Sequence, residues 1–278
     1  MKERAYAKIN LCLDIAGVRE DGYHELKMIM VPLNFYDVLE MVPASETTLT
    51  VNRSYLPVNE KNTIITAVKV MQEMYGFTQG FACSLSKHIP TRAGLAGGSA
   101  DAAAAIRMID RMMHLNMSRE EMIAAAKKVG SDVPFCVFNQ PSYVEGTGDI
   151  LYPFEVNTPM EILLVKPRRG VSTKEAFALA DSREVVHPDC QAMRTALINN
   201  DYEGVCASLG NSLEAASLEL VSDIRNIKEN LKGRGFDGVL MSGSGSTVFG
   251  LTRNRDLVES TMKELRARRY FVRHTNIL

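Results

Sequence analysis

Cysteine is scarce in this chain of 278 residues and forms no recognisable metal-binding pattern. The five cysteines stand far apart, and none belongs to a Cys-x-x-Cys pair or a Cys/His cluster with zinc-site spacing. An odd number of cysteines without framework spacing is typical of a reducing compartment, where buried thiols pack as small apolar groups. We therefore expect most of Cys12, Cys83, Cys136, Cys190 and Cys206 to be unpaired.

Long hydrophobic runs and a strong net charge are also missing. No stretch approaches the roughly 18 apolar residues that span a bilayer, and residues 1–15 alternate polar and apolar side chains instead of forming a signal peptide. The formal net charge is −1, from 32 basic and 33 acidic residues, so no global field favours nucleic acid or an anionic membrane. We expect a cytoplasmic protein that binds neither nucleic acid nor a membrane, and the sequence does not indicate its oligomeric state.

The hydrophobic periodicity changes repeatedly along the chain. Alternating or continuous apolar patterns predict strands over residues 4–16, 26–33, 81–85, 161–165 and 270–274. Helical spacing predicts helices over residues 62–75, 99–115, 118–130, 173–181 and 254–268, the third opened by a capping box. Strands and helices are mixed rather than strictly alternating, which favours an α+β fold. The length suits two lobes, and we expect an N-terminal domain over 1–155 and a C-terminal domain over 156–278.

A glycine-rich segment precedes the helix expected at 99–115. Glycines without a Cβ let backbone N–H groups approach a ligand closely, and the following helix adds unpaired N–H groups and the positive end of its dipole. This combination suits a phosphate. The alternative is a flexible turn with Ser99 as the helix N-cap. The G-x-x-x-x-G-K-[ST], G-x-G-x-x-G, G-x-S-x-G and H-E-x-x-H patterns are all absent, which argues against P-loop, dinucleotide-binding and common hydrolase sites.

The same segment resembles the second motif, P-x-x-x-G-L-G-G-G-S-[SA], of the galactokinase–homoserine kinase–mevalonate kinase–phosphomevalonate kinase superfamily. Ala96 replaces one glycine of that pattern, and its methyl group is tolerable if φ is negative. The resemblance implies a two-lobed kinase fold with mixed sheets and helices, an active site in the cleft between the lobes, and ATP as co-substrate. The segment that would bind ATP comprises Pro90, Thr91, Arg92, Ala93, Gly94, Leu95, Ala96, Gly97, Gly98, Ser99 and Ala100.

Further motifs narrow the resemblance and cover nearly the whole chain. Residues 7–11 (AKINL) and 241–249 (MSGSGSTVF) are similar to the first and third motifs of the superfamily. Residues 19–24 (REDGYH) and 130–135 (GSDVPF) resemble segments of the 4-diphosphocytidyl-2-C-methyl-D-erythritol kinase family. This resemblance implies transfer of the γ-phosphoryl group of ATP to the 2-hydroxyl of a cytidine-diphosphate-linked methylerythritol, a step in the non-mevalonate route to isoprenoids.

Two catalytic residues follow from the family pattern. The resemblance implies that Asp132 is the base and that the Lys8 ammonium lies beside it, stabilising charge during transfer. Without the resemblance, Asp132 reads as a polar loop residue or turn-former, and Lys8 as the solvated side of a sheet. Nothing in the sequence itself brings the two side chains together.

Substrate recognition is assigned in the same way. The resemblance implies that His24 hydrogen-bonds the cytosine edge and that Tyr23 and Phe177 stack on the ring. Asn10 and Thr173 are expected to reach the substrate. The alternatives are a surface histidine and core aromatics. Ser244 and Gly245 are expected in a second turn near the phosphates. The alternative is that this turn is a simple hairpin connection.

No cluster of His, Cys, Asp and Glu forms a complete metal site in the sequence, so Mg²⁺ is expected to arrive bound to ATP. Two other functions stay open at this point. One is a kinase of the same fold that acts on homoserine or a mevalonate derivative, and the other is a non-catalytic nucleotide-binding regulator.

Overall fold

A computed structural model describes residues 1–278, which form ten helices and eleven strands. The chain folds into two compact units. The first contains residues 1–8, 35–91 and 96–139, and the second contains residues 9–34, 92–95 and 140–278. The first strand and the glycine-rich segment each contribute residues to both units.

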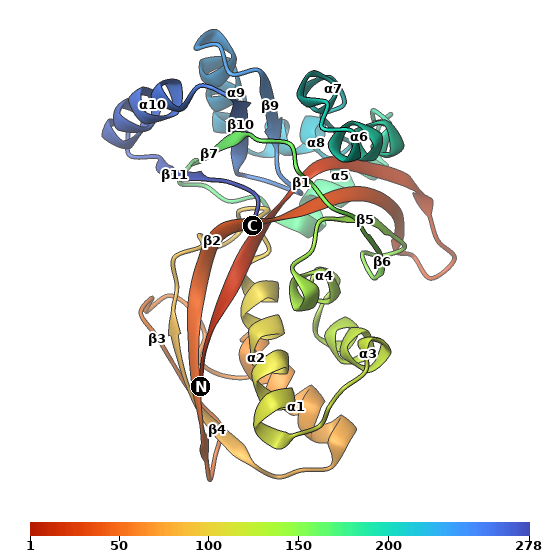
Figure 1. Ribbon diagram of the computed structural model, residues 1–278, viewed down its shortest axis with the longest axis vertical. Coiled ribbons are helices and arrows are strands. Elements are labelled where there is room, and N and C mark those ends of the chain that lie inside the picture. Colours follow the sequence, from red (N-terminus) through yellow and green to blue (C-terminus); the bar gives the residue numbers. More distant parts are fainter. The chain divides into compact units, whose positions relative to one another are not determined.

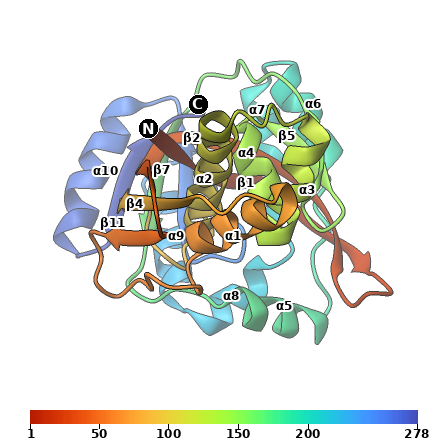
Figure 2. The same cartoon turned by 90° about the horizontal axis from the view of Figure 1, so that it is seen from below.

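The first unit packs helices against paired strands (Figures 1 and 2). Its strands are parts of β1 (Lys2–Val18) and β2 (His24–Ala44) together with β3 (Thr48–Val51) and β4 (Gly80–Ser86). Residues 38–44 of β2 pair antiparallel with β4, and β3 pairs parallel with β4. The helices are α1 (Thr63–Tyr75), α2 (Gly97–Met113), α3 (Arg119–Val129) and α4 (Val133–Phe138). Helix α2 contacts both α1 and α4, and the Thr63 hydroxyl of α1 donates to the carbonyl of Gly98 in the first turn of α2.

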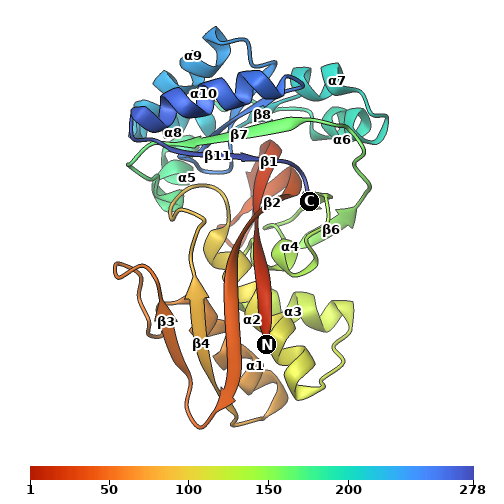
Figure 3. The same cartoon turned by 60° about the vertical axis from the view of Figure 1, so that its left-hand side comes forward.

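The second unit contains a four-stranded antiparallel sheet in the order β11-β7-β10-β9. The strands are β7 (Glu161–Lys166), β9 (Gly238–Met241), β10 (Val248–Thr252) and β11 (Phe271–Thr275). Helices α9 (Asp223–Gly233) and α10 (Arg255–Ala267) pack on this sheet (Figure 3). Strand β10 is buried along its whole length, as expected for a central strand covered by helices.

Other strands of the second unit pair with the parts of β1 and β2 that belong to this unit. The hairpin β5 (Ser142–Glu145) and β6 (Ile150–Pro153) pairs with residues 28–30 of β2, and β8 (Gly210–Asn211) pairs parallel with β1 at Cys12. The remaining helices are α5 (Thr173–Asp181), α6 (Cys190–Ile198), α7 (Tyr202–Ala207) and α8 (Glu214–Leu220). Helices α5 and α8 lie side by side (Figure 2).

Several predicted helices and strands are confirmed, including the residue at which one helix begins. Helix α3 has both hydrogen bonds of the capping box, in which Ser118 and Glu121 each accept from the other's backbone N–H. Strands and helices occur at every range that periodicity indicated, and β1 buries the predicted alternate side chains. The helix α4 was not predicted, because its buried Val-Pro-Phe-Cys-Val-Phe sequence is too short to show helical spacing.

Three of the five cysteines are unpaired, in line with the expectation for most of them, and the other two are bonded. Cys12 and Cys190 form a disulfide with their Cα atoms 5.5 Å apart, whereas Cys83, Cys136 and Cys206 are free. The two bonded residues are 178 positions apart, so spacing gave no reason to pair them. No helix of the chain is both long enough and apolar enough to cross a bilayer.

Candidate active site

Lys8 and Asp132 form an ion pair within the first unit. The Nζ atom of Lys8 lies 3.6 Å from Oδ2 of Asp132, and the lysine side chain is 4% exposed while the aspartate side chain is 34% exposed. Lys8 is therefore not on a solvated sheet face, since it is buried near the middle of β1. A buried ammonium beside a half-exposed carboxylate is suited to holding negative charge at a place that a substrate can reach.

The local backbone leaves the Asp132 carboxylate available for this pair. Asp132 is the N-cap residue of α4, yet its side chain makes no capping hydrogen bond. Its backbone carbonyl instead accepts from the N–H of Cys136, and the N–H of Val133 bonds to Gly130. The carboxylate consequently does not serve as a turn-forming acceptor at the start of the helix, which favours a chemical role over a purely local one.

The start of α2 belongs to the first unit and has the properties of an anion site. The helix begins at Gly97, and no side chain caps it, so its first N–H groups and the positive end of its dipole face outward from the helix end. Ser99 is the third residue of the helix rather than its N-cap. Ala96 has φ 53°, in the left-handed region, so the condition of a negative φ for its methyl group is not met. This conformation costs an alanine about 1–2 kcal/mol.

Residues 92–95 of the glycine-rich segment lie in the second unit, against the turn that joins β9 and β10. The Ser242 hydroxyl donates to the carbonyl of Gly94 at 2.8 Å, and the N–H of Thr247 donates to Ala93 at 3.2 Å. Gly94 has φ +70°, and a Cβ there would lie 2.0 Å from the Ser242 carbonyl oxygen. The position therefore requires glycine for both its conformation and its surroundings.

The turn after β9 is held by several side chains of the second unit. Ser217 on α8 donates to the carbonyl of Ser244 at 2.9 Å, and the amide of Asn211 donates to Gly243 at 2.8 Å. The hydroxyls of Thr173 and Ser244 lie 2.8 Å apart, which brings these two predicted site residues together. The turn is therefore a hairpin connection, as one interpretation of the sequence expected. Its small polar residues are also held in place by these hydrogen bonds.

A second group of predicted residues meets at the end of α5. The ring of His24 stacks on Phe177 with centroids 4.5 Å apart, and Nε2 of His24 lies 2.7 Å from Oδ1 of Asp181. Tyr23, by contrast, is 62% exposed, and its backbone belongs to the turn that Asp21 stabilises. The structure therefore brings His24 and Phe177 into contact and leaves the Tyr23 ring on the surface.

Asn10 is fully buried two residues after Lys8 on β1. Its backbone N–H donates to the Ser242 hydroxyl at 3.3 Å, and its side-chain amide is directed at the sulfur of Met28 at the same distance. The side chain therefore lies inside the second unit beside the turn that follows β9.

Sequence reasoning missed Asp181 and Ser242. Asp181 stands four residues after Phe177, so helical spacing alone places both on one face of α5. Ser242 lay inside a recognised motif, but its bond to Gly94, 148 residues away, has no local signal. No group of three or more His, Cys, Asp or Glu side chains that could hold a metal ion is present in the chain.

Comparison with known proteins identifies the family. A model described as the GHMP kinases N terminal domain matches residues 62–140, and one described as GHMP kinases C terminal matches residues 193–270. The two matches together cover more than half of the chain. The chain belongs to the GHMP kinases. It is thereby an ATP-dependent kinase, and the N-terminal match contains the start of α2 and Asp132.

Individual GHMP kinases resemble the chain over nearly its whole length. It is 42% identical to the 4-diphosphocytidyl-2-C-methyl-D-erythritol kinase of Clostridium beijerinckii over 253 residues, covering 90% of both chains. It is 39% identical to the enzyme of the same name from Geobacillus kaustophilus over 266 residues, covering 95% of this chain and 92% of the relative. A crystal structure titled 4-(cytidine 5'-diphospho)-2C-methyl-D-erythritol kinase superposes with a TM-score of 0.81 at 28% identity, covering 99% of both chains.

Proposed function

We propose that the chain transfers the γ-phosphoryl group of ATP to the 2-hydroxyl of 4-diphosphocytidyl-2-C-methyl-D-erythritol, in the non-mevalonate route to isoprenoid precursors. The observation that carries the proposal is the Lys8–Asp132 ion pair, which occurs in a chain whose full-length relatives carry that enzyme's name.

Asp132 acts as the base in this proposal. Its carboxylate accepts the proton of the 2-hydroxyl as the oxygen attacks the γ-phosphorus, and the bond from that phosphorus to the β,γ-bridging oxygen breaks to release ADP. The Lys8 ammonium stabilises the negative charge that develops on the attacking oxygen. Its 4% exposure strengthens this effect, because little water screens the charge.

Residues 90–100 bind the phosphates of ATP in this proposal, through backbone N–H groups and the start of α2. Mg²⁺ is taken to arrive with those phosphates. His24 reads the cytosine edge through Nδ1, which is left as an acceptor when Nε2 donates to Asp181. Phe177 and Tyr23 flank the base, and Asn10 and Thr173 contact the acceptor portion. The protein is proposed to work in the cytoplasm.

A coupled assay of ADP release tests the proposal. We expect turnover with the cytidylated substrate and none with 2-C-methyl-D-erythritol 4-phosphate, homoserine or mevalonate. Reactions without acceptor measure background ATP hydrolysis, and phosphorus NMR locates the new phosphate on the 2-oxygen. Equal turnover of the uncytidylated compound would overturn the proposed substrate, while Asp132→Asn with full turnover would overturn the assignment of the base.

A further inference from the structure

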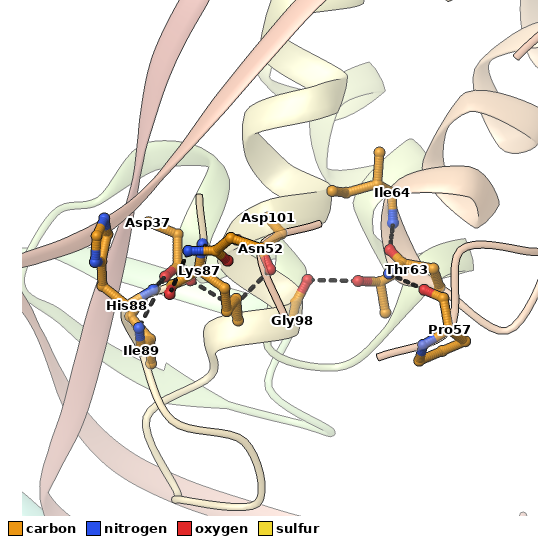
Figure 4. Close-up of polar contacts among 11 residues, drawn as sticks. Asp37, Asn52, Pro57, Thr63, Ile64, Lys87, His88, Ile89, Gly98 and Asp101 are labelled. Atoms are coloured by element: carbon orange, nitrogen blue, oxygen red, sulfur yellow. Dashed lines mark hydrogen bonds and ion pairs between the residues drawn. The ribbon is translucent and has the colours of Figure 1, made fainter. Parts of the chain in front are cut away.

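Three ionisable side chains meet in the interior of the first unit, apart from Lys8 and Asp132 (Figure 4). Lys87, directly after β4, forms ion pairs with Asp37 of β2 and with Asp101 of α2. The Lys87 Nζ to Asp101 Oδ2 distance is 2.6 Å. Side-chain exposures are 4% for Lys87, 0% for Asp37 and 4% for Asp101, so water screens none of these charges. We refer to Lys87, Asp37 and Asp101 as the buried triad.

The buried triad holds the backbone on both sides of the glycine-rich segment. The Oδ1 atom of Asp37 accepts hydrogen bonds from the N–H groups of His88 and Ile89, the latter at 2.8 Å. On the other side, Asp101 belongs to the first turns of α2. A Cβ on Gly97 would lie 2.9 Å from Lys87 Nζ, so the ammonium lies directly against the first residue of the helix.

The charges of the buried triad do not cancel if both acids are ionised. Two carboxylates around one ammonium leave one net negative charge in a buried site, which is strongly unfavourable. Asp37 accepts hydrogen bonds from two backbone N–H groups and from the ammonium, so each of these bonds uses it as an acceptor. Asp101 shares the ammonium and interacts with the Asp37 carboxylate, and its other oxygen, Oδ1, has no hydrogen-bond partner although it is buried. The geometry therefore assigns the proton to Asp101.

The pKa values agree with this assignment. Burial raises the pKa of Asp101 to about 8, with the charge of Asp37 acting in the same direction and Lys87 acting against both. Burial disfavours the Lys87 ammonium, but the two carboxylates outweigh it, so the pKa of Lys87 is raised. From α4, the buried Cys136 thiol also faces this region, and its pKa is raised mainly by burial, so it stays neutral. From α1, Thr63 contributes an uncharged hydroxyl, which donates to the carbonyl of Gly98 at 2.7 Å.

We propose that the buried triad is a positioning unit for the start of α2, and that the proton held by Asp101 keeps this end of the helix free of a fixed negative charge when it receives the phosphates of ATP. The inference rests on the proposed role of this segment in ATP binding. In this proposal the residues of the buried triad contact neither ATP nor the acceptor. They set the charge and the conformation of the backbone that contacts ATP. Loss of the proton adds a negative charge next to Gly97, which repels a polyphosphate.

Equilibrium binding of MgATP, measured calorimetrically without acceptor from pH 7 to pH 9, tests the inference. For the wild type we expect the Kd to rise by about tenfold across this range, because one added charge acts on the bound phosphates at low screening. In Asp101→Asn the side chain is always neutral, so the rise should disappear. A parallel rise in wild type and Asp101→Asn would overturn the proposal.

Two further variants separate this effect from general damage. Asp110→Asn removes a carboxylate from the far end of the same helix, where it accepts from the N–H of Met117, and should keep the wild-type rise. Asp37→Asn removes the charge that helps to hold the proton on Asp101, so the rise should move to lower pH. An unchanged midpoint in Asp37→Asn, with binding retained, would contradict the proposed coupling.

A measurement on the wild type alone remains decisive if Asp101→Asn does not fold. Binding near pH 8.5 should draw a fraction of a proton from solution, because the bound state favours protonated Asp101. Calorimetry in buffers of different ionisation enthalpy measures this uptake, and its absence would overturn the inference. Since no acceptor is present, a failure of the proposed substrate leaves the result unaffected.

Discussion

The Nε2 atom of His24 lies 2.7 Å from Oδ1 of Asp181, and Phe177, one helical turn before Asp181, stacks on the same imidazole. The carboxylate fixes which nitrogen of the ring faces away from α5. Two side chains of one helix thus set both the plane and the hydrogen-bonding direction of His24.

Replacing Asp181 by alanine should weaken recognition of the cytosine. We expect the KM for the cytidylated substrate to rise about tenfold, the effect of losing one partly exposed charge-assisted hydrogen bond. The KM for ATP should not change. Glu175→Ala, in the first turn of the same helix, is the control and should leave both values near those of the wild type. Equal changes in the two KM values would argue against a role in reading the base.

Removing either member of the Lys8–Asp132 pair should abolish most turnover. We expect Asp132→Asn and Lys8→Met each to lower kcat by about 10²–10⁴-fold, the range for a positioned proton acceptor or charge stabiliser. Since the two groups are proposed to act on one oxygen, the double variant should be no slower than the worse single variant by more than about threefold. Calorimetric ATP binding in each variant checks that the phosphate site is retained. Fully additive losses would contradict a shared role.

Gly94→Ala should destabilise the protein more than an alanine at another positive-φ glycine. Both Gly94 (φ +70°) and Gly76 (φ +68°) are left-handed, but a Cβ at Gly76 meets nothing within 4 Å, whereas at Gly94 it meets the Ser242 carbonyl oxygen at 2.0 Å. We expect Gly76→Ala to cost about 1 kcal/mol and Gly94→Ala about 3 kcal/mol or more, as measured by urea unfolding. Similar losses would show that the backbone conformation alone is responsible.

Ala96→Gly should stabilise the fold. Relief of the left-handed conformation at φ 53° outweighs the added freedom of the unfolded chain, and we expect a gain of about 0.5–1 kcal/mol. Ala100 is buried inside α2, the helix that follows Ala96, and Ala100→Gly is the matched control. This variant should lower the free energy of unfolding by about 1 kcal/mol. A loss of stability in both variants would indicate that the Ala96 methyl group makes favourable contacts that exceed its strain.

Asp101 should also make stability depend on pH. Burial raises its pKa to about 8 in the folded chain, against about 4 when unfolded. Between these values the folded state binds more protons, so its stability falls as pH rises, by at most about 1.4 kcal/mol per pH unit. Relative to Asp101→Asn, the wild type should lose stability from pH 5 to pH 8 in urea titrations and change little above that. A constant difference across this range would contradict protonation of Asp101.

Local features of the sequence predicted much of the fold. The alternation along residues 4–16 indicated β1, and Ser118 with Glu121 indicated where α3 begins, because each pattern is complete within a few neighbouring residues. The division into two units was not predictable in this way. Contacts of residues 9–34 and 92–95 with the C-terminal half depend on long-range pairing, which no local pattern records.

The same distinction between local patterns and long-range contacts decides which parts of the site were predictable. The glycine-rich segment and the start of α2 were visible because turn chemistry and helical periodicity meet there. The approach of Lys8 to Asp132 followed only from the resemblance, since the two are far apart in sequence. Asp37 gave no signal at all. It lies within a long strand, where an acidic residue normally faces water. Only the tertiary structure shows that Lys87 pairs with it and that two backbone N–H groups donate hydrogen bonds to it.

The parallel pairing of β1 with β8 has a consequence for synthesis on the ribosome. Cys12 lies opposite Gly210, and its disulfide partner is Cys190. An emerging chain therefore carries one of its first strands incompletely paired until about three quarters of the polypeptide has been translated. Nascent chains halted before residue 190 should expose this segment to proteases and to chaperones that bind apolar strands.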